Sequence, residues 1–228
     1  YTLVRNEQNA AHMASGYARI SGKTGVCIVT SGPGATNLLT GIATAYMDSI
    51  PLVAFTGQVP SHLLGRDIFQ EVDITGAASA FSKHSYLVKD AAELPRIISE
   101  SFHIASTGRP GPVLIDVPID VQEQVVFDPV FPEEVNIRGY HPSVRGNDKQ
   151  ITHVVNAIAT AQRPVICAGG GVFLSNALLE LETFAARTRI PVVTTMMGLS
   201  LLPTDHPLNM GMIGTHGNAC ANKALAKS

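Results

Sequence analysis

The chain alternates between short apolar runs and segments whose apolar residues recur at helical spacing. Ala10, Ala11, Ala14 and Tyr17 fall on one face of a helix expected over residues 7–20, which "SGKTG" ends. The runs "GVCIVT", "IPLVAFTG", "HSYLV" and "GPVLIDVP" predict strands, with helices between them in "SGPGATNLLTGIATAYMDS" and over residues 91–107. Because the strands are apolar at consecutive positions, we expect both of their faces to be covered, as in a mostly parallel α/β sheet.

A change of pattern divides the chain. Residues 124–147, "QVVFDPVFPEEVNIRGYHPSVRGN", contain several prolines and little periodicity, which is typical of a linker. A second α/β pattern follows, with helices in "DKQITHVVNAIATA" and "SNALLELETFAART", strands in "PVICAGGG" and "IPVVTT", and then a long loop rich in Gly and Met. The sequence therefore predicts two three-layer α/β/α domains, over residues 1–123 and 148–228. The first residue is Tyr1 and "ANKALAKS" breaks off a helical pattern, so we expect a piece of a longer chain with both domains incomplete.

Composition narrows the classes of function. With 45% hydrophobic residues, 15% charged residues and a net charge of −2, the chain has no basic field that would hold nucleic acid. Its apolar runs end well short of the ~20 residues that a bilayer span needs, so we expect no membrane segment and a cytoplasmic protein. Cys27, Cys167 and Cys220 lie far apart without CxxC spacing, which predicts neither a disulfide nor a zinc site. We expect all three to be small core residues.

Two glycine-containing turns are candidate ligand sites. "SGPGATN" follows an expected strand and opens a helix, where backbone amides can hold a polar or anionic group, although such a turn is more often structural. "CAGGGV" is the stronger signal, because three consecutive glycines at the carboxyl end of a strand let a ligand approach the backbone. For that position a nucleotide-like ligand and a purely structural turn remain equally open.

The polar residues between these elements have ordinary explanations. Gln58, Gln70 and Glu71 belong to the long polar loop "TGQVPSHLLGRDIFQEVD", and their residue types alone favour solvated side chains. Glu7 follows Asn6, a suitable helix N-cap, and a carboxylate in the first turn is stabilised by the helix dipole. No residue in this set requires a catalytic role by its local sequence.

The motifs taken together and in order resemble the acetohydroxyacid synthase (acetolactate synthase) family of thiamine diphosphate enzymes. The resemblance rests on "RNEQNAAHMASGYAR", "TSGPGATNLLTGIATAYMDSIPLVAFTGQV", "FQEVDI", "GRPGPVLIDVPIDVQ", "RPVICAGGGV" and "TTMMGLS…MGMIGTHGNACAN", and covers essentially the whole chain. It implies that residues 1–123 form most of a pyrimidine-binding domain with the thiamine diphosphate-binding fold. Residues 148–228 would begin a Rossmann-like central domain that binds FAD. The family's "GDG…N" motif, which holds the diphosphate through Mg²⁺ in a further domain, does not occur here.

The resemblance gives Glu7 a catalytic role. It implies that this carboxylate shares a proton with ring N1′ of the aminopyrimidine, which favours the imino tautomer that acts as base toward thiazolium C2. We expect burial to raise the pKa of Glu7 toward the working range. The implied reaction joins the two-carbon unit of pyruvate to a second 2-ketoacid, either pyruvate or 2-ketobutyrate, as the first common step of branched-chain amino-acid synthesis.

The same resemblance assigns further site residues position by position. Pro33 and Asn37 would line the aminopyrimidine pocket, and Phe69 and Gln70 would lie close to the reacting carbon, with Gln70 counted as catalytic. FAD, which carries no net redox in this branch, would contact the central-domain residues Gly169, Gly170, Gly171, Thr195, Met196, Met197, Ile213, Gly214, Thr215 and His216.

Three positions depart from the family pattern. Asn6 replaces a histidine, Ile119 replaces a lysine, and Ser79 stands where many members place an arginine that contacts FAD. Since an arginine supplies a bidentate donor that serine lacks, FAD is less firmly implied than thiamine diphosphate.

The implied partners are those of the family. They are a homodimer or tetramer and a possible regulatory small subunit, with Mg²⁺ held outside this chain. Two alternatives remain open, namely another thiamine diphosphate-dependent decarboxylase, carboligase or pyruvate oxidase, and a nucleotide-binding α/β module without catalysis.

Overall fold

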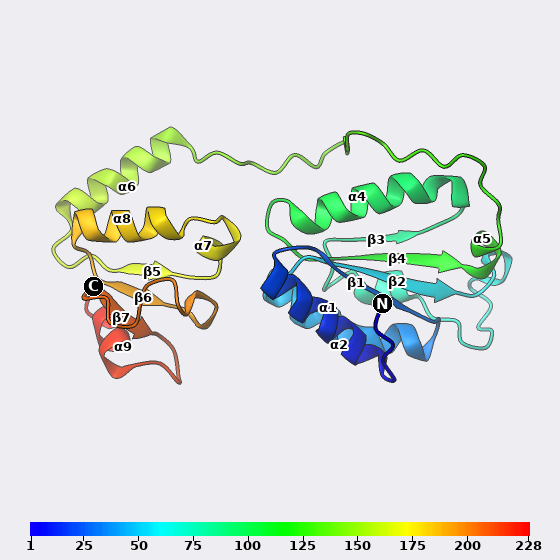
Figure 1. Ribbon diagram of the computed structural model, residues 1–228, viewed down its shortest axis with the longest axis horizontal. Helices are drawn as coiled ribbons and strands as arrows, with labels where there is room; N and C mark the ends of the chain where they lie inside the picture. The colour runs from blue at the N-terminus through cyan, green and yellow to red at the C-terminus, as the bar shows by residue number, and fades with distance from the viewer. The chain divides into compact units, whose positions relative to one another are not determined.

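A computed structural model describes all 228 residues of the chain. It divides into two compact units, Tyr1–Val144 and Arg145–Ser228, which are described separately (Figure 1). None of its helices combines the length and apolar character needed to cross a bilayer.

The first unit is built on a four-stranded sheet in the order β1-β2-β4-β3, and all of its strand pairs are parallel. The strands are β1 (Gly25–Val29), β2 (Leu52–Gln58), β3 (His84–Leu87) and β4 (Pro112–Pro118). The connecting helices are α1 (Glu7–Ser21), α2 (Pro33–Met47), α3 (Ile74–Ala78), α4 (Leu94–Ser106) and the short α5 (Ile119–Gln122). The predicted parallel α/β fold is confirmed, and α3 follows the long polar loop before β3.

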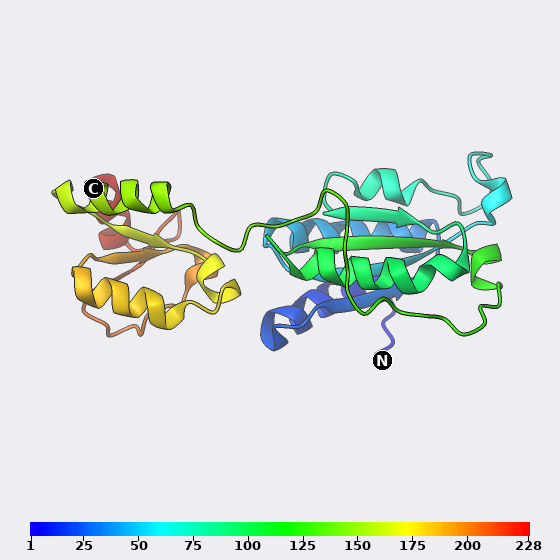
Figure 2. The ribbon, with the colours of Figure 1, turned by 90° about the horizontal axis from the view of Figure 1, so that it is seen from above.

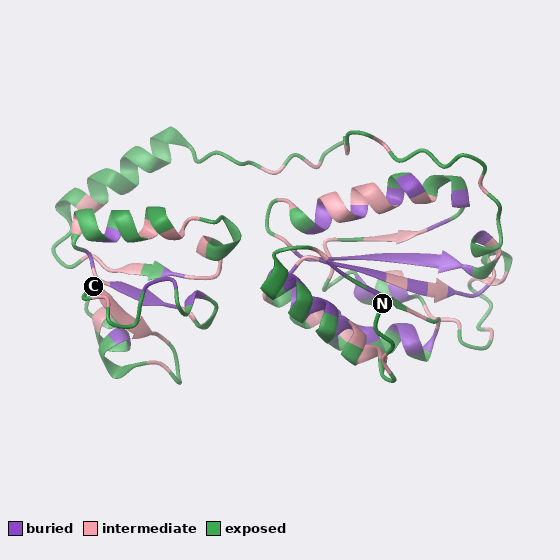
Figure 3. Cartoon of the chain, viewed as in Figure 1, coloured by how far each residue is buried: buried purple, intermediate pink, exposed green.

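Helices cover both faces of this sheet. Leu52, Ala54 and Leu114 pack with α1, α2 and α3 in one apolar cluster, whereas Val53 and Val113 face α4 in a second cluster. Neighbouring residues along β2 and β4 therefore enter different cores, which explains why these two strands are mostly apolar. Strand β1 departs from the expectation of two covered faces, because its Val26 and Ile28 are exposed. The buried strands lie between the helices in Figures 1 and 2, and Figure 3 shows the burial of β2 and β4.

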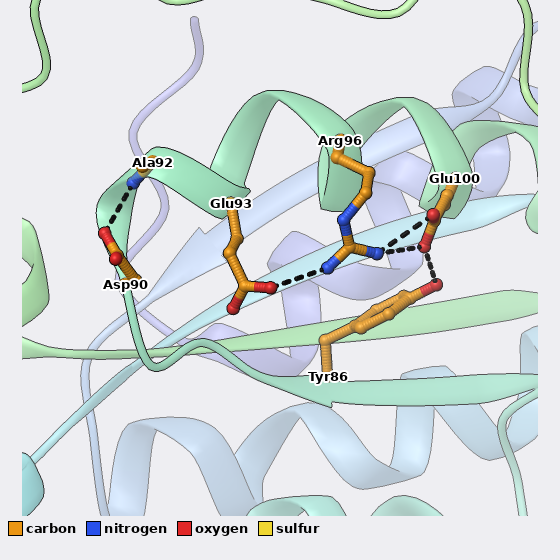
Figure 4. A network of polar contacts seen from close by, with 6 residues as sticks. All are labelled: Tyr86, Asp90, Ala92, Glu93, Arg96 and Glu100. Atoms are coloured by element: carbon orange, nitrogen blue, oxygen red, sulfur yellow. Dashed lines mark hydrogen bonds and ion pairs between the residues drawn. The ribbon is translucent and has the colours of Figure 1, made fainter.

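Polar contacts fix α4 against β3 (Figure 4). Arg96 binds both carboxylate oxygens of Glu100 over 2.9 Å and also reaches Glu93 over 2.9 Å. Tyr86 on β3 donates to Glu100 over 2.8 Å, and Asp90 caps the preceding turn. Burial and the neighbouring Glu100 both raise the pKa of Tyr86, so its hydroxyl remains a donor across the usual pH range.

The second unit has a three-stranded parallel sheet in the order β5-β6-β7. Its elements are α6 (Asp148–Thr160), β5 (Ile166–Ala168), α7 (Gly171–Leu174), α8 (Leu178–Thr188), β6 (Val192–Thr194), β7 (Asn209–Met212) and α9 (Ala219–Ala226). Helices α8 and α9 lie on opposite sides of the sheet in both ribbon views (Figures 1 and 2). The core joins Ala185 of α8 to Val192 and to Leu201 and Leu202 of the following loop.

Strand β7 corrects the expectation of a long loop after β6. Its sequence, "NMGM", contains Asn and Gly, which are poor strand formers, so the pattern gives no strand signal. Pairing with β6 nevertheless forms it, with an irregular register between Val192 and Val193.

The segment expected as a linker packs on the first unit over part of its length. Ile137 and Tyr140 contact the α4-side core, and the Lys83 ammonium donates to the Tyr140 hydroxyl over 2.9 Å. The boundary between the two units falls after Val144.

The expectation that all three cysteines are core residues is correct only for Cys27. Burial raises the pKa of the Cys27 thiol to about 12, which keeps it protonated. Cys167 and Cys220 are exposed. Cys167 alternates along β5 with Ile166 and Ala168, which pack in the core, and Cys220 lies in the first turn of α9.

Candidate functional site

Helix α1 begins at Glu7, where the sequence supplies an N-cap. The extended residue Asn6 accepts a hydrogen bond from the Gln8 amide over 2.9 Å with its side-chain oxygen. The buried face of the helix consists of small residues, Ala11, Ala14 and Ala18 among them. Glu7 thus stands half-exposed at the first turn of a helix that packs closely on its neighbours.

The close contact between α1 and α2 sets the position of Glu7. A Cβ atom at Gly41 would lie 2.4 Å from the Cβ of Ala11, so the two helices touch where only glycine fits. Four residues earlier on both helices, Asn37 donates from Nδ2 to Glu7 Oε2 over 3.0 Å. Residues four apart share a helix face, so the Ala11–Gly41 contact and the Glu7–Asn37 hydrogen bond belong to one interface.

Hydrogen bonds determine the ionisation of Glu7 in this chain. The donor from Asn37, followed by the backbone amide of Glu7, lowers the pKa of the carboxyl group from its ordinary value, and desolvation opposes them only weakly. The expectation that burial raises this pKa is therefore wrong for this chain. Glu7 is an ionised hydrogen-bond acceptor at neutral pH.

The turn between β1 and α2 lies next to two of the predicted site residues, Glu7 and Gln70. Gly32 has a φ of 59° and a ψ of −120°, and a Cβ atom there would lie 2.7 Å from the carbonyl oxygen of Gln70. A Cβ atom at Gly34 would lie 3.6 Å from Oε1 of Glu7. The turn therefore lies between Glu7 and Gln70, with Pro33 at the first position of α2.

The polar loop after β2 carries Phe69 and Gln70, both of which are exposed, and Phe69 is 87% exposed. Gln70 adopts a left-handed backbone with a φ of 61°. Glu71 accepts hydrogen bonds from the amides of Gly65 and Ile68, so the loop is closed on itself. These bonds lower the pKa of Glu71, whose partly exposed carboxylate is held by the loop backbone.

The prediction of a solvated side chain is wrong for Gln58. Gln58 is 6% exposed at the end of β2, and it donates from Nε2 to Asp116 Oδ2 over 2.9 Å and to the Val72 carbonyl over 2.8 Å. Its own side-chain oxygen accepts the amide of Val59 over 2.9 Å. Asp116 is 1% exposed and accepts a second hydrogen bond from Thr56 over 2.6 Å.

Burial raises the pKa of Asp116 to about 6, while the hydrogen bonds from Thr56 and Gln58 lower it and the charge of Asp73 adds to the rise. Sequence reasoning missed this buried group. The available signal was a polar residue inside each of two strands that are otherwise apolar, "LVAFTGQ" and "PVLIDVP".

The predicted residues of the second unit gather at one edge of its sheet. The glycine run follows β5, Thr195 follows β6 and Ile213 follows β7, and parallel strands bring these carboxyl ends together. The Thr195 amide donates to the Ala168 carbonyl over 3.0 Å, and the Ile213 amide donates to the Thr194 carbonyl over 2.9 Å.

The glycines at this edge allow close backbone packing. A Cβ atom at Gly169 would lie 3.2 Å from Thr195 Oγ1, and one at Gly170 would lie 3.0 Å from Met197 Cβ. Gly171 has open space around it. Met196 follows Thr195 in the sequence, and Gly214, Thr215 and His216 follow Ile213. All four residues are exposed.

Ser79, the residue that departs from the family pattern, ends α3 in the first unit. Its hydroxyl donates to the Gly76 carbonyl over 2.7 Å, and the residue is exposed. Its side chain therefore hydrogen-bonds within the C-terminal end of α3.

Comparisons with known proteins agree on one family. Residues 1–77 match the family described as "Thiamine pyrophosphate enzyme, N-terminal TPP binding domain", and residues 151–228 match "Thiamine pyrophosphate enzyme, central domain". Together the two segments cover more than half of the chain.

The relatives described next are all named as acetolactate synthases or their large subunits. It is 52% identical over 227 residues to "Acetolactate synthase" of Arthrospira platensis, a match that covers 98% of this chain and 39% of the relative. It is 50% identical over 228 residues to "Acetolactate synthase large subunit" of Corynebacterium glutamicum, covering 100% of this chain and 36% of the relative. A "Probable acetolactate synthase large subunit" of Methanocaldococcus jannaschii is 50% identical over 229 residues, covering 100% of this chain and 39% of the relative. The chain thus spans well under half the length of these relatives.

Proposed function

Since this chain belongs to the thiamine pyrophosphate enzyme family, we propose that the whole protein is an acetolactate synthase. It would decarboxylate pyruvate and transfer the two-carbon unit to a second 2-ketoacid, either pyruvate or 2-ketobutyrate. The names of relatives about half identical to this chain support this proposal, and so does the placement of Glu7 between Asn37 and the "SGPG" turn.

Glu7 is the group proposed to handle a proton. Its Oε2 is occupied by the Asn37 amide, whereas its Oε1 faces the backbone of the turn at Gly34. An ionised carboxylate in that position accepts a hydrogen bond from a ring N–H that approaches over the turn. Pro33 and Asn37 would line the same pocket, because both lie in the first two turns of α2.

Thiamine diphosphate fits this set of residues, and when bound it supplies the carbon that adds to a 2-ketoacid and takes up the electrons released with carbon dioxide. Within the chain, Gln70 is proposed as a catalytic donor and Phe69 as an apolar wall beside the reacting carbon. Gln70 packs over Gly32 while Glu7 faces Gly34, so one turn fixes both sides of the proposed site.

The remaining assignments are proposed more coarsely. FAD would lie at the carboxyl edge of the β5-β6-β7 sheet, against Gly169–Gly171, Thr195–Met197 and Ile213–His216, where open backbone at Gly171 supports close approach. Ser79 weakens that assignment, because it offers no bidentate donor. Residues 1–123 would be the pyrimidine-binding domain, 124–147 the linker and 148–228 the start of the central domain. Mg²⁺, a homodimer or tetramer, a small regulatory subunit and a cytoplasmic location complete the proposal.

The product formed from pyruvate alone tests the proposed activity. The intact protein, supplied with thiamine diphosphate, Mg²⁺, FAD and pyruvate, is expected to release acetolactate, identified by NMR. Release of acetaldehyde, or of acetyl phosphate with peroxide, would instead assign the protein to another branch of the family.

The Glu7→Gln variant tests the proposed proton handling. The change keeps the size of the side chain and removes its charge, so turnover should fall about 100-fold or more, in the range that general acid–base groups supply. Glu93→Gln is the matched control, because Glu93 makes an exposed ion pair with Arg96 on α4. Equal turnover of the two variants would remove Glu7 from the mechanism.

A further inference from the structure

The loop between β2 and α3 reaches the proposed site but is mostly exposed. Phe69 and Gln70 are exposed, and Gln70 also holds a left-handed backbone conformation. A surface loop keeps one conformation only if contacts at its ends and within it specify that conformation. The question is which buried groups supply those contacts.

One end of the loop is tied to the sheet by a buried side chain. Gln58 uses one amide hydrogen to bind the Val72 carbonyl over 2.8 Å, two residues after Gln70. It uses the other to bind Asp116 over 2.9 Å, and its oxygen accepts the Val59 amide over 2.9 Å. Both amide hydrogens and the amide oxygen of Gln58 have partners, so its side chain has a single orientation.

Asp116 sets that orientation. Its Oδ1 accepts from Thr56 over 2.6 Å, which leaves Oδ2 facing Gln58 as an acceptor only. An acceptor there requires the nitrogen of Gln58 to face it, and the nitrogen is then also directed at Val72. Asp116 is only 1% exposed, and burying a carboxylate costs free energy. Its position in an otherwise apolar strand therefore indicates a specific role.

We propose that Gln58 and Asp116 are positioning residues for the proposed reaction, which hold the 59–73 loop so that Gln70 packs on the Gly32 turn. This inference rests on the proposed function, because it concerns the same site. Neither residue touches the reacting atoms. Both act through the Val72 carbonyl and the backbone that follows Gln70.

A paired exchange of residues separates positioning from stability. Gln58→Glu keeps the acceptor for the Val59 amide but removes both donors, and it sets two buried carboxyl groups against each other. The double change Gln58→Glu with Asp116→Asn restores a donor–acceptor pair between the two side chains. The Val72 carbonyl still lacks its donor in the double variant.

Hydrogen exchange of the backbone amides of residues 64–71, measured without cofactor, reports directly on the conformation of the loop. We expect both Gln58→Glu and the double variant to exchange this segment about tenfold faster than the unmodified protein. In the double variant, strands β2 and β4 should return to their original exchange. Tyr86→Phe is the control, since it removes a partly buried hydrogen bond to Glu100 without touching Gln58, Asp116 or the loop, and it should leave the exchange of residues 64–71 unchanged.

Kinetics of the intact enzyme complete the test. The double variant should lose about 10- to 100-fold in kcat with a smaller change in KM, as expected for a misplaced group. Gln58→Met keeps the length of the side chain but removes its amide donors, and it replaces the Gln58→Glu variant if that variant does not fold. Unchanged exchange of residues 64–71 in the double variant and in Gln58→Met would overturn the positioning role. An unmodified enzyme that makes no acetolactate would overturn the proposed function, while the exchange data would still decide the role of Gln58.

Discussion

The Gly32 turn is the feature whose geometry makes the sharpest prediction. Gly32 has a φ of 59° and a ψ of −120°, and a Cβ atom there would meet the Gln70 carbonyl oxygen at 2.7 Å and the Gln70 Cα at 2.9 Å. Gly22, at the end of α1, also has a positive φ of 69°, but a Cβ atom would have nothing within 4 Å. Both alanine substitutions therefore carry a backbone penalty, and only Gly32→Ala adds a steric clash.

The magnitudes follow from these two terms. Gly22→Ala should destabilise the chain by about 1 to 2 kcal/mol, the penalty for a side chain in the left-handed region. For Gly32→Ala the backbone term is about 1 to 3 kcal/mol. Forcing atoms into a filled space adds about 1 to 3 kcal/mol, since the clashing atoms are backbone and cannot rotate away. Gly32→Ala should thus be the more destabilising change by at least about 1 kcal/mol.

Guanidinium unfolding followed by tyrosine fluorescence measures this difference. The chain has no tryptophan, and all five of its tyrosines lie in Tyr1–Val144, so the signal reports the unit that contains both glycines. A Gly32→Ala midpoint equal to or above that of Gly22→Ala, at unchanged slope, would refute the close packing of Gln70 on the turn.

Three further outcomes are expected. Asn37→Ala removes the largest cause of the lowered pKa of Glu7, so a carboxyl NMR titration should show that pKa rising toward its ordinary value; no change would mean that another group holds the carboxylate. Because the pKa of Asp116 is raised to about 6 in the folded state, the folded chain binds an extra proton between about pH 4 and 6, and its stability should fall as the pH rises through that window. Asp116→Asn should flatten this pH dependence in unfolding experiments. An unaltered pH dependence would exclude Asp116 as its cause. Two thiols should react promptly with a disulfide reagent at pH 8 while Cys27 reacts only on unfolding, and three fast thiols would contradict its burial.

The sequence predicts the fold well where burial alone decides it. Strands β2 and β4 were visible because each is covered on both faces, so they read as continuous apolar runs. Helix α1 was visible from its N-cap at Asn6 and its alanine spacing. Strand β7 was not visible, because it is held by pairing with β6 rather than by the intrinsic preference of "NMGM".

The candidate site was predictable in part and for a different reason. Local sequence gave Glu7 only a helix-end role, and the resemblance of the ordered motifs supplied its partners. The structure brings Glu7, Asn37, Gln70 and the glycine turn together. It does not support solvation of Gln58, because tertiary contacts with Asp116 and Val72 cannot be read from the spacing of residues 58, 72 and 116.

The lowered pKa of Glu7 and the proposed proton sharing act in opposite directions, and Asn37 reconciles them. A ligand that covers the turn would remove water from Glu7 and raise its pKa, as burial does for any carboxylate. Without a donor, that rise would favour a fully protonated carboxyl group, which could no longer accept a ring N–H at that oxygen. The Asn37 amide, 3.0 Å from Oε2, stabilises the ionised form and offsets part of the rise. In the proposed reaction Glu7 would thereby be kept as an acceptor on Oε1, the oxygen that faces Gly34. The α1–α2 contact at Ala11 and Gly41 would contribute to that role, because it sets the distance between the Glu7 and Asn37 side chains.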